Sequence, residues 1–328
     1  MANKEMKTLT MGGNTYEIVD KATRDRVDIL EDNQLIMTDN GNGEVNLTTT
    51  NISMIDAALS ESSTNAIQNR AVYNALNNID ISKIWPDGAG AHNSINRGKD
   101  LGTSVTATQW ANISNGTFKD LFPGDYWTIG GIKWIIGECD RYLHYGDREF
   151  TKHHLVMFPA SGLYDAQMTN SPSGSWDSNY NTTANGYAGS DMRTTNLANA
   201  KTTISNAFGS NHIITYRQLF TTAVSNGNPT NTAWYDATVE LMNESMVYGA
   251  PIFGSGSSVS NNMYDRYIID KTQLAAFRND PSLICIRDWW WLRDVVSDAH
   301  FANVARDGVC NHSIASLPYA VRPCFLIG

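Results

Sequence analysis

Residues 287–328 have the sequence RDWWWLRDVVSDAHFANVARDGVCNHSIASLPYAVRPCFLIG. Apolar runs at Trp289–Leu292, Phe301–Val304 and Val321–Ile327 predict three short strands, and polar, irregular segments separate them. Side chains alternate between the two faces of a strand, so the three consecutive tryptophans cannot all face the core. The segment is therefore expected to combine a buried framework with a displayed surface.

A framework role is expected for the tryptophans and for two arginines. Arg322, which is followed by Pro323, lies inside an apolar strand. A buried guanidinium must be paired or hydrogen-bonded, so Arg322 is predicted to tie loops together through backbone carbonyls or through a carboxylate, with Asp288 and Asp294 as candidates. The expected framework residues are Trp289, Trp290, Trp291, Arg293, Gly308 and Arg322.

The residues between these framework positions are mostly polar, and they are predicted to form a ligand-binding face. Aromatic and hydrogen-bonding side chains of this kind are typical of binding surfaces. The candidates are Asp294, Val295, Val296, Ser297, Asp298, His300, Asn303, Arg306, Asp307, Asn311, His312, Ser313, Ser316 and Tyr319.

Short strands, long loops and a few helices are expected upstream, which predicts an α+β domain whose function lies in its loops. A hairpin is predicted with strands over Tyr126–Ile129 and Ile132–Ile136. Asn170–Gly189 is predicted as a long loop, and Asp191–Phe208 as a helix with Ser190 as its cap. The remaining predictions are strands at His154–Pro159, Ala237–Met242 and Leu283–Ile286 and a helix near Lys271–Phe277.

The first part of the chain has only small elements. A hairpin is predicted over Thr8–Val19, a helix over Lys21–Leu30 and a second strand pair over Gln34–Thr50, while Met54–Ile79 has a narrow apolar stripe. Elements of this size cannot bury a core alone, so self-association is expected. Pro86–Asn96 is rich in Gly, Asn and Pro and predicts a linker or a loop. The expected division is residues 1–85 for oligomerisation, 86–117 for a linker and lead-in, and 118–328 for the main domain.

Composition excludes several classes of function. The formal net charge is −9 with 24 Lys and Arg residues, and no basic run is present, so nucleic-acid binding is not expected. No apolar run approaches the roughly 18 residues that span a bilayer, and the N-terminus lacks the apolar region of a secretory signal. The four cysteines show no metal-binding or disulfide spacing, which predicts free, buried thiols in a protein made in a reducing cytoplasm. They are Cys139, Cys285, Cys310 and Cys324.

The pattern Trp-Trp-Leu-Arg, Phe-x-x-Val, Gly and Val-Arg-Pro-x-Phe in residues 290–325 resembles the end of a C-type-lectin-fold domain. Domains of this kind occur in variable proteins of diversity-generating retroelements and in related bacterial and phage proteins. Gly124–Trp134, Ser190–Arg193 and Glu240–Glu244 fit the same family, so the resemblance covers residues 118–328. It implies a C-type-lectin-like domain with a variable ligand-binding face.

A coding restriction agrees with this resemblance. Retroelements of this class randomise template adenines, typically within Asn codons, and the resulting codons cannot encode Lys, Glu, Gln, Met or Trp. Leu292–Gly328 contains none of these five residue types. Histidine is one permitted outcome, and His300 and His312 are interpreted in this way.

Two N-terminal segments resemble phage structural proteins. Residues 59–76, LSESSTNAIQNRAVYNAL, are similar to a motif of tail-fibre and baseplate proteins, and residues 8–30 are similar to the start of many virion proteins. The resemblance implies a virion part, most often a trimer. The expected function is that of a phage receptor-binding protein, made in the bacterial cytoplasm and placed in the virion tail. Its expected partners are other tail proteins and a host cell-surface receptor, either protein or glycan.

Two alternatives remain open: a structural baseplate or fibre protein, and an enzyme on the related formylglycine-generating scaffold, for which Cys310 and Cys324 would matter. Adjacent His153 and His154 point to opposite sides and cannot easily share a metal. A carboxylate pair such as Asp298 and Asp307 could act as acid and base, but nothing in the sequence places them together. Residues 177–191 could supply oxygen ligands for calcium. The sequence predicts no catalytic residue, no metal and no cofactor.

Overall fold

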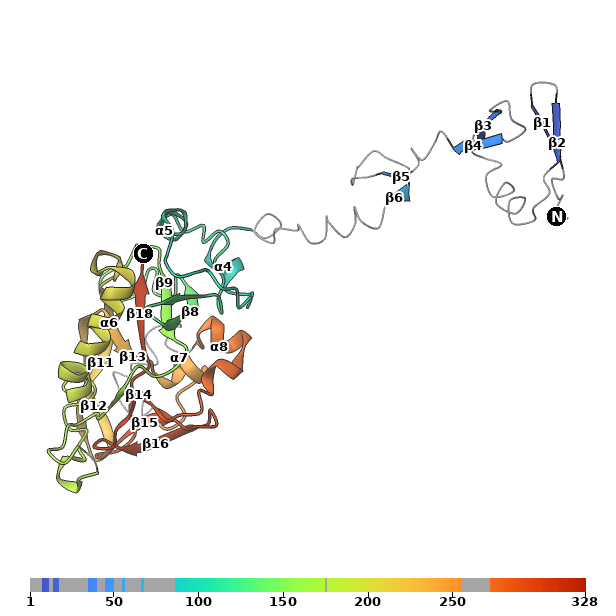
Figure 1. The fold of residues 1–328 in the computed structure, drawn as a ribbon. Coiled ribbons are helices and arrows are strands. Elements are labelled where there is room, and N and C mark those ends of the chain that lie inside the picture. Colours follow the sequence, from blue (N-terminus) through green and yellow to red (C-terminus); the bar gives the residue numbers. More distant parts are fainter. Residues whose placement is uncertain are drawn as a thin grey trace. The chain divides into compact units, whose positions relative to one another are not determined.

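The computed structural model describes residues 86–254 except Ser175, residues 272–328, and short strands within residues 8–67. The chain forms two compact units, Met1–Asp80 and Ile81–Gly328 (Figure 1).

The N-terminal unit contains the two strand pairs that the sequence predicts. Strands β1 (Thr8–Met11) and β2 (Asn14–Glu17) are antiparallel, as are β3 (Leu35–Asp39) and β4 (Val45–Thr49). Two further two-residue strands, β5 (Ile55–Asp56) and β6 (Ala66–Ile67), pair in parallel. The helix predicted over Lys21–Leu30 and most of the Met54–Ile79 stripe lie outside the described residues.

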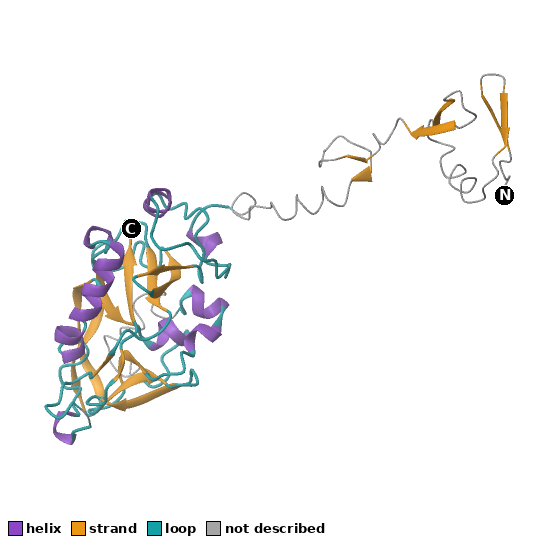
Figure 2. Ribbon diagram, viewed as in Figure 1, coloured by secondary structure: helices purple, strands orange, loops and turns teal. Residues whose placement is uncertain are grey.

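The C-terminal unit is an α+β domain with two five-stranded sheets, and Figure 2 shows α6 running along one side of its strands. The first sheet is antiparallel throughout and has the order β13-β18-β9-β8-β7. Its strands are β7 (Tyr126–Ile129), β8 (Ile132–Cys139), β9 (Leu155–Pro159), β13 (Val239–Leu241) and β18 (Pro323–Ile327). These strands confirm the predicted hairpin and the predicted strands around residues 154–159, 237–242 and 321–327.

The second sheet, called here the terminal sheet, has the order β10-β17-β14-β15-β16. Its central strand β14 pairs with β17 in parallel and with β15 antiparallel, and β16 is the edge strand beyond β15. The strands are β10 (Asp165–Ala166), β14 (Trp290–Val295), β15 (His300–Val304), β16 (Cys310–Ile314) and β17 (Tyr319–Ala320). The predicted strands at residues 289–292 and 301–304 are confirmed, whereas β16 was not predicted.

The helices flank these sheets. The predicted helix over residues 191–208 is confirmed as a π-helical turn, Met192–Asn196, followed by α6 (Ala198–Phe208), and Ser190 Oγ accepts the Arg193 N–H. The helix predicted near residue 277 is α8 (Ala275–Asn279). The others are α4 (Ala89–His92), α5 (Ala107–Ser114) and α7 (Glu244–Tyr248).

The secondary structure of this unit departs from the sequence analysis at two further places. The strand expected at Leu283–Ile286 is wrong, because Pro281–Ile284 is a 3₁₀ helix. Asp280 caps it by accepting the Ser282 N–H, and proline suits the first helical position. A long hairpin was missed: β11 (Tyr216–Ser225) and β12 (Asn228–Ala237) turn through Asn226 and Gly227, whose φ angles of 50° and 72° are typical of a type I′ turn.

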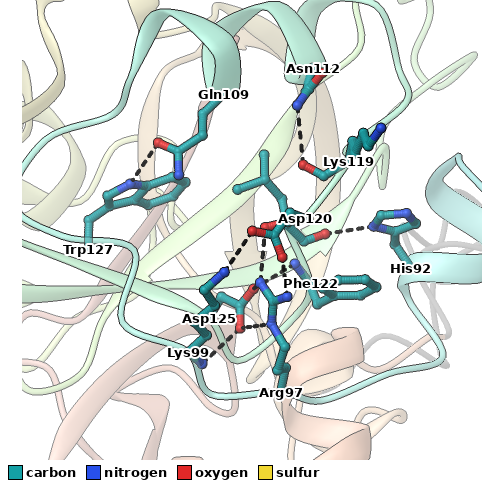
Figure 3. A network of polar contacts seen from close by, with 11 residues as sticks. His92, Arg97, Lys99, Gln109, Asn112, Lys119, Asp120, Phe122, Asp125 and Trp127 are labelled. Carbon is teal, nitrogen blue, oxygen red and sulfur yellow. Dashed lines mark hydrogen bonds and ion pairs between the residues drawn. The ribbon is translucent and has the colours of Figure 1, made fainter. Parts of the chain in front are cut away.

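Residues 86–117 lie within the C-terminal unit, which begins at Ile81. His92 of α4 is buried, stacks on Phe122 and shares a 2.7 Å hydrogen bond between its Nδ1 and the carbonyl oxygen of Leu121. Arg97 binds the carboxylates of both Asp120 and Asp125 (Figure 3). These contacts fasten the segment to the first sheet.

The pKa values of the two carboxylates in this network shift in opposite directions. Burial alone would raise the pKa of Asp120, but its contacts with Lys99 and Arg97 outweigh burial and lower it. Asp125 is more deeply buried, and there burial raises the pKa despite the bonds from Arg97. The network therefore combines one carboxylate that favours ionisation with one that resists it.

Candidate functional site

Arg322 lies at the centre of the framework, fully buried between the two sheets. Its Nε donates to the carbonyl of Pro159 (3.0 Å) and its Nη2 to that of Ala160 (3.4 Å). Its guanidinium carbon lies 4.9 Å from the ring centroid of Trp290 and 5.0 Å from that of Phe158. Burial lowers the pKa of Arg322 to about 9. Backbone carbonyls are thus the ties that the sequence predicted, and the carboxylate alternative is wrong.

The three tryptophans alternate across β14 as predicted. Trp290 is buried, and its Nε1 donates to the carbonyl of Ile284 (3.3 Å). Trp291 is buried on the opposite face, and its Nε1 donates to the carbonyl of Ala166 (2.9 Å). Trp289 is half-buried and stacks on Tyr319 with ring centroids 5.4 Å apart.

The two remaining framework residues fix the surrounding loops. Arg293 is buried, and its Nη1 donates to the carbonyl of Leu241 (3.2 Å). Gly308 has a φ of 86°, and an added Cβ would lie 3.2 Å from Cβ of Cys285. Its carbonyl accepts the Tyr248 hydroxyl at 2.9 Å. A left-handed φ beside a close neighbour explains why glycine stands there.

Four of the residues predicted to be displayed are buried, so that part of the prediction is wrong: Asp294, Val295, Asn303 and Ser316. Asp294 Oδ2 accepts the N–H of Glu244 (2.7 Å). Ser316 Oγ donates to Asn181 Oδ1 (2.6 Å) and accepts the N–H of Asp177 (3.0 Å). Asn303 lies on the inner strand β15, paired with Trp291 on one side and Asn311 on the other.

The other ten candidates reach the surface and are called here the terminal surface. Asp298, Arg306, Asp307 and His312 are exposed, and Val296, Ser297, His300, Asn311, Ser313 and Tyr319 are half-buried. They lie in the turns that flank β15, on β15 and β16, and in β17. Figure 1 shows β14, β15 and β16 side by side at one end of the C-terminal unit.

The terminal surface is divided between the two faces of the sheet. Pairing of Ala302 with His312 places His312 on the same face as His300, and their ring centroids are 5.2 Å apart. Asn311 and Ser313 point to the other face. There the Ser313 Oγ and the Tyr319 hydroxyl lie 3.1 Å apart. Arg306 and Asp307 occupy the turn at the far end of β15 from Asp298, so Asp298 and Asp307 do not form an acid–base pair.

The turn between β14 and β15 is held by two segments from elsewhere in the chain. Asp298 Oδ1 accepts the N–H of Gly227 at the tip of the β11–β12 hairpin (2.6 Å). Thr183 donates its N–H to the carbonyl of Asp298 (2.9 Å) and its hydroxyl to that of Ser297 (2.7 Å). Thr183 belongs to the predicted long loop, which also carries the exposed Trp176. This loop therefore borders the terminal surface, which the sequence did not predict.

A buried acidic cluster lies behind the edge strand. The carboxylate of Glu244 accepts the N–H groups of Ile252 (2.6 Å), Phe253 (3.0 Å) and Gly254 (2.9 Å). The Cys310 thiol donates to Glu244 Oε1 at 3.3 Å. Burial, and then the nearby Glu244, raise the pKa of Asp294 well above its usual range.

The cysteines are free, as predicted, although Cys285 is exposed and not buried. Burial, and then Glu244, raise the pKa of Cys310, and burial raises the pKa of Cys324 to about 12. A thiol with a raised pKa holds little thiolate at neutral pH and is a poor nucleophile. Burial therefore disfavours the thiolate form of both residues.

His153 and His154 bond in different directions. His153 Nδ1 lies 2.7 Å from Asp140 Oδ2, whereas the buried His154 accepts the Tyr142 N–H at its Nε2. Burial lowers the pKa of His154 to about 4. Among the described residues no three His, Cys, Asp or Glu side chains are grouped to hold a metal ion, and no described helix is long and apolar enough to cross a membrane.

A cavity of about 490 Å³ lies away from the terminal surface and is lined by residues including Ser114, Lys152, His153 and Asn211. None of the candidate residues lines it. No protein-family model, curated protein or solved structure matches this chain.

Proposed function

We propose that this protein is a phage tail receptor-binding protein whose C-terminal unit is a C-type-lectin-like domain displaying a variable face to the host cell surface. The observation that carries the proposal is the division within the terminal sheet. Its central strand β14 is buried throughout, whereas the edge strand β16, the turns that flank β15, His300 of β15 and Tyr319 of β17 carry the ten exposed or half-buried residues of the terminal surface. A fixed framework thus supports a surface that can vary.

The terminal sheet allows side chains of the terminal surface to be substituted without loss of its framework. Main-chain pairing between β15 and β16 holds His300, Asn311, His312 and Ser313 in place whatever their side chains are. Buried Arg322 and Trp290 bond instead to main-chain carbonyls of Pro159, Ala160 and Ile284. Ligand chemistry on this surface is varied, with His, Asn, Asp, Arg, Ser and Tyr side chains, which suits recognition of a protein or a glycan.

The N-terminal region supports the proposal only through its sequence resemblance to virion proteins. According to the proposal, residues 1–80 attach the protein to the tail and assemble it, most simply as a homotrimer. Three copies of one weak site gain avidity on a dense cell surface without a tight single contact. Analytical ultracentrifugation of the full chain tests this part: a trimer is expected, and a monomer at micromolar concentration contradicts it.

Receptor binding is tested with two triple variants of the full chain. The first, Arg306→Ala/Asn311→Ala/His312→Ala, changes the terminal surface, and the control, Thr195→Ala/Asn199→Ala/Asn206→Ala, changes exposed positions on and just before α6. Both should retain the wild-type melting temperature to within a few degrees, because exposed side chains contribute little to stability. Flow cytometry of labelled protein on a panel of bacterial strains should show at least about tenfold weaker binding by the first variant alone. Equal binding by both variants contradicts the proposal.

The retroelement origin has a separate test in the genome that encodes the chain. A near-repeat of the coding region for residues 289–328 is expected close to a reverse-transcriptase gene. The two copies should differ at adenines of the repeat. Differences spread over all four bases, or the absence of such a repeat, contradict a retroelement origin without affecting receptor binding.

A further inference from the structure

Two histidines meet on one face of the terminal sheet. His300 begins β15 and His312 lies on β16, and the pairing of His300 with Ile314 and of Ala302 with His312 makes the two histidines diagonal neighbours. Their ring centroids are 5.2 Å apart and their planes are 83° apart. His312 is exposed and His300 is half-buried.

This spacing matches two imidazoles that share one metal ion. A transition metal lies about 2.0–2.1 Å from a ligating imidazole nitrogen, hence about 3.2 Å from the ring centroid. At a tetrahedral angle, two such rings have centroids about 5.2 Å apart. Rotation about the last side-chain bond of histidine is soft, so the nitrogens can turn toward a common point.

His300 also has the outer contact that a ligating histidine needs. Its Nδ1 lies 2.8 Å from Ser297 Oγ, which leaves Nε2 free to bind an ion while Nδ1 carries the proton and donates to the serine. Burial, and then His312, lower the pKa of His300, which favours the neutral, ligating form. Within the described part of the chain, neither ring nitrogen of His312 has a hydrogen-bond partner, and the ring rests edge-on against Phe253 at 5.0 Å.

We propose that His300 and His312 form an open two-histidine site for a late first-row transition ion such as Cu²⁺, Ni²⁺ or Zn²⁺. The protein supplies two nitrogen ligands, and water fills the remaining positions. No third His, Cys, Asp or Glu joins the pair among the described residues, so the site differs from a closed structural zinc site. The proposal does not depend on the receptor-binding function, since it concerns only these two side chains.

The test is isothermal titration of the metal-free full chain with Cu²⁺, Ni²⁺, Zn²⁺ and Mg²⁺ at pH 7.5. One ion per chain is expected, bound more tightly as Cu²⁺ than as Ni²⁺ or Zn²⁺, with no binding of Mg²⁺. His300→Ala and His312→Ala should each weaken Cu²⁺ binding at least about tenfold, and acidification to pH 5 should release the ion because both imidazoles must be neutral. His144→Ala, a matched change at another exposed histidine that contacts Glu149, should leave this affinity unchanged.

Electron paramagnetic resonance of the Cu²⁺ form identifies the ligands directly. Two nitrogen ligands are expected in the wild type and in His144→Ala, and one in each of the other two variants. Melting temperatures check that all variants fold. Copper binding that survives in the His300→Ala/His312→Ala double variant, or that is lost in His144→Ala, overturns the proposal, as does the absence of any binding.

Discussion

The central strand β14 and the edge strand β16 belong to the same sheet and to the same stretch of sequence, yet they differ in what they can tolerate. Every residue of β14 is buried, whereas only Cys310 of β16 is. Side chains on β14 are fixed by distant parts of the chain, since Arg293 bonds to Leu241 and Asp294 to Glu244. Residues of β16 are held mainly by main-chain pairing with β15. Position within the sheet, more than polarity, therefore separates framework from surface.

The largest effect is expected at the framework. Arg322→Ala removes a fully buried side chain that packs on Trp290 and Phe158, and it leaves two carbonyl oxygens without donors. Loss of a large buried side chain costs about 3–5 kcal/mol. Urea denaturation should show this loss, whereas the exposed control Arg306→Ala should stay within about 0.5 kcal/mol of wild type. If both variants had the same free energy of unfolding, the assignment of Arg322 to the framework and of Arg306 to the surface would be contradicted.

The sequence predicted this framework because its signals are local. Alternating tryptophans and an arginine in an apolar strand can be recognised within a few residues. Burial of Asp294 and Ser316 could not be predicted, because it depends on Glu244 and on Asn181, which lie far away in the sequence. Their polarity favoured exposure, and the tertiary contacts overrode it.

The missed elements have a similar explanation. Strand β16, with the sequence CNHSI, lacks a clear apolar alternation because it is an edge strand with half-buried faces. The β11–β12 hairpin did have a local signal, the Asn226-Gly227 turn, but β12 is too polar to suggest a strand. The two-histidine pair could not be found from spacing alone, because the register between β15 and β16 brings the rings together.

An intermediate effect on stability is expected at Asp294 of β14, and this effect should depend on pH. Because its folded-state pKa is raised, the stability that protonated Asp294 provides is complete below the unfolded value of about 3.9 and is lost as pH rises through the folded pKa. Asp294→Asn keeps an acceptor for the Glu244 N–H but cannot ionise. The free energy of unfolding of the variant, relative to wild type, should therefore increase between pH 4 and pH 8.

The matched control is Asp307→Asn, at an exposed carboxylate of the terminal surface. Its stability relative to wild type should stay nearly constant over the same range. Urea denaturation at several pH values measures both variants. A flat profile for Asp294→Asn would show that this carboxyl is not held in its protonated form.

The smallest effect on stability is expected at Cys285. This thiol is exposed and donates to the carbonyl of Arg306 (3.2 Å), whereas the other three cysteines are buried. A thiol reagent should modify one cysteine per folded chain and four after denaturation. Cys285→Ser should abolish the fast reaction and change stability by no more than about 0.5 kcal/mol. Rapid modification of Cys310 in the folded protein would contradict the burial of the edge strand's first residue.

An alanine scan of residues 290–328 tests the central claim most directly, with protease resistance and cell binding measured for each variant. The account predicts that variants of β14 and Arg322 lose both, and that variants of the terminal surface lose cell binding while remaining folded. Binding that is lost only when folding is lost, at every position scanned, would contradict the separation of a fixed framework from a displayed surface.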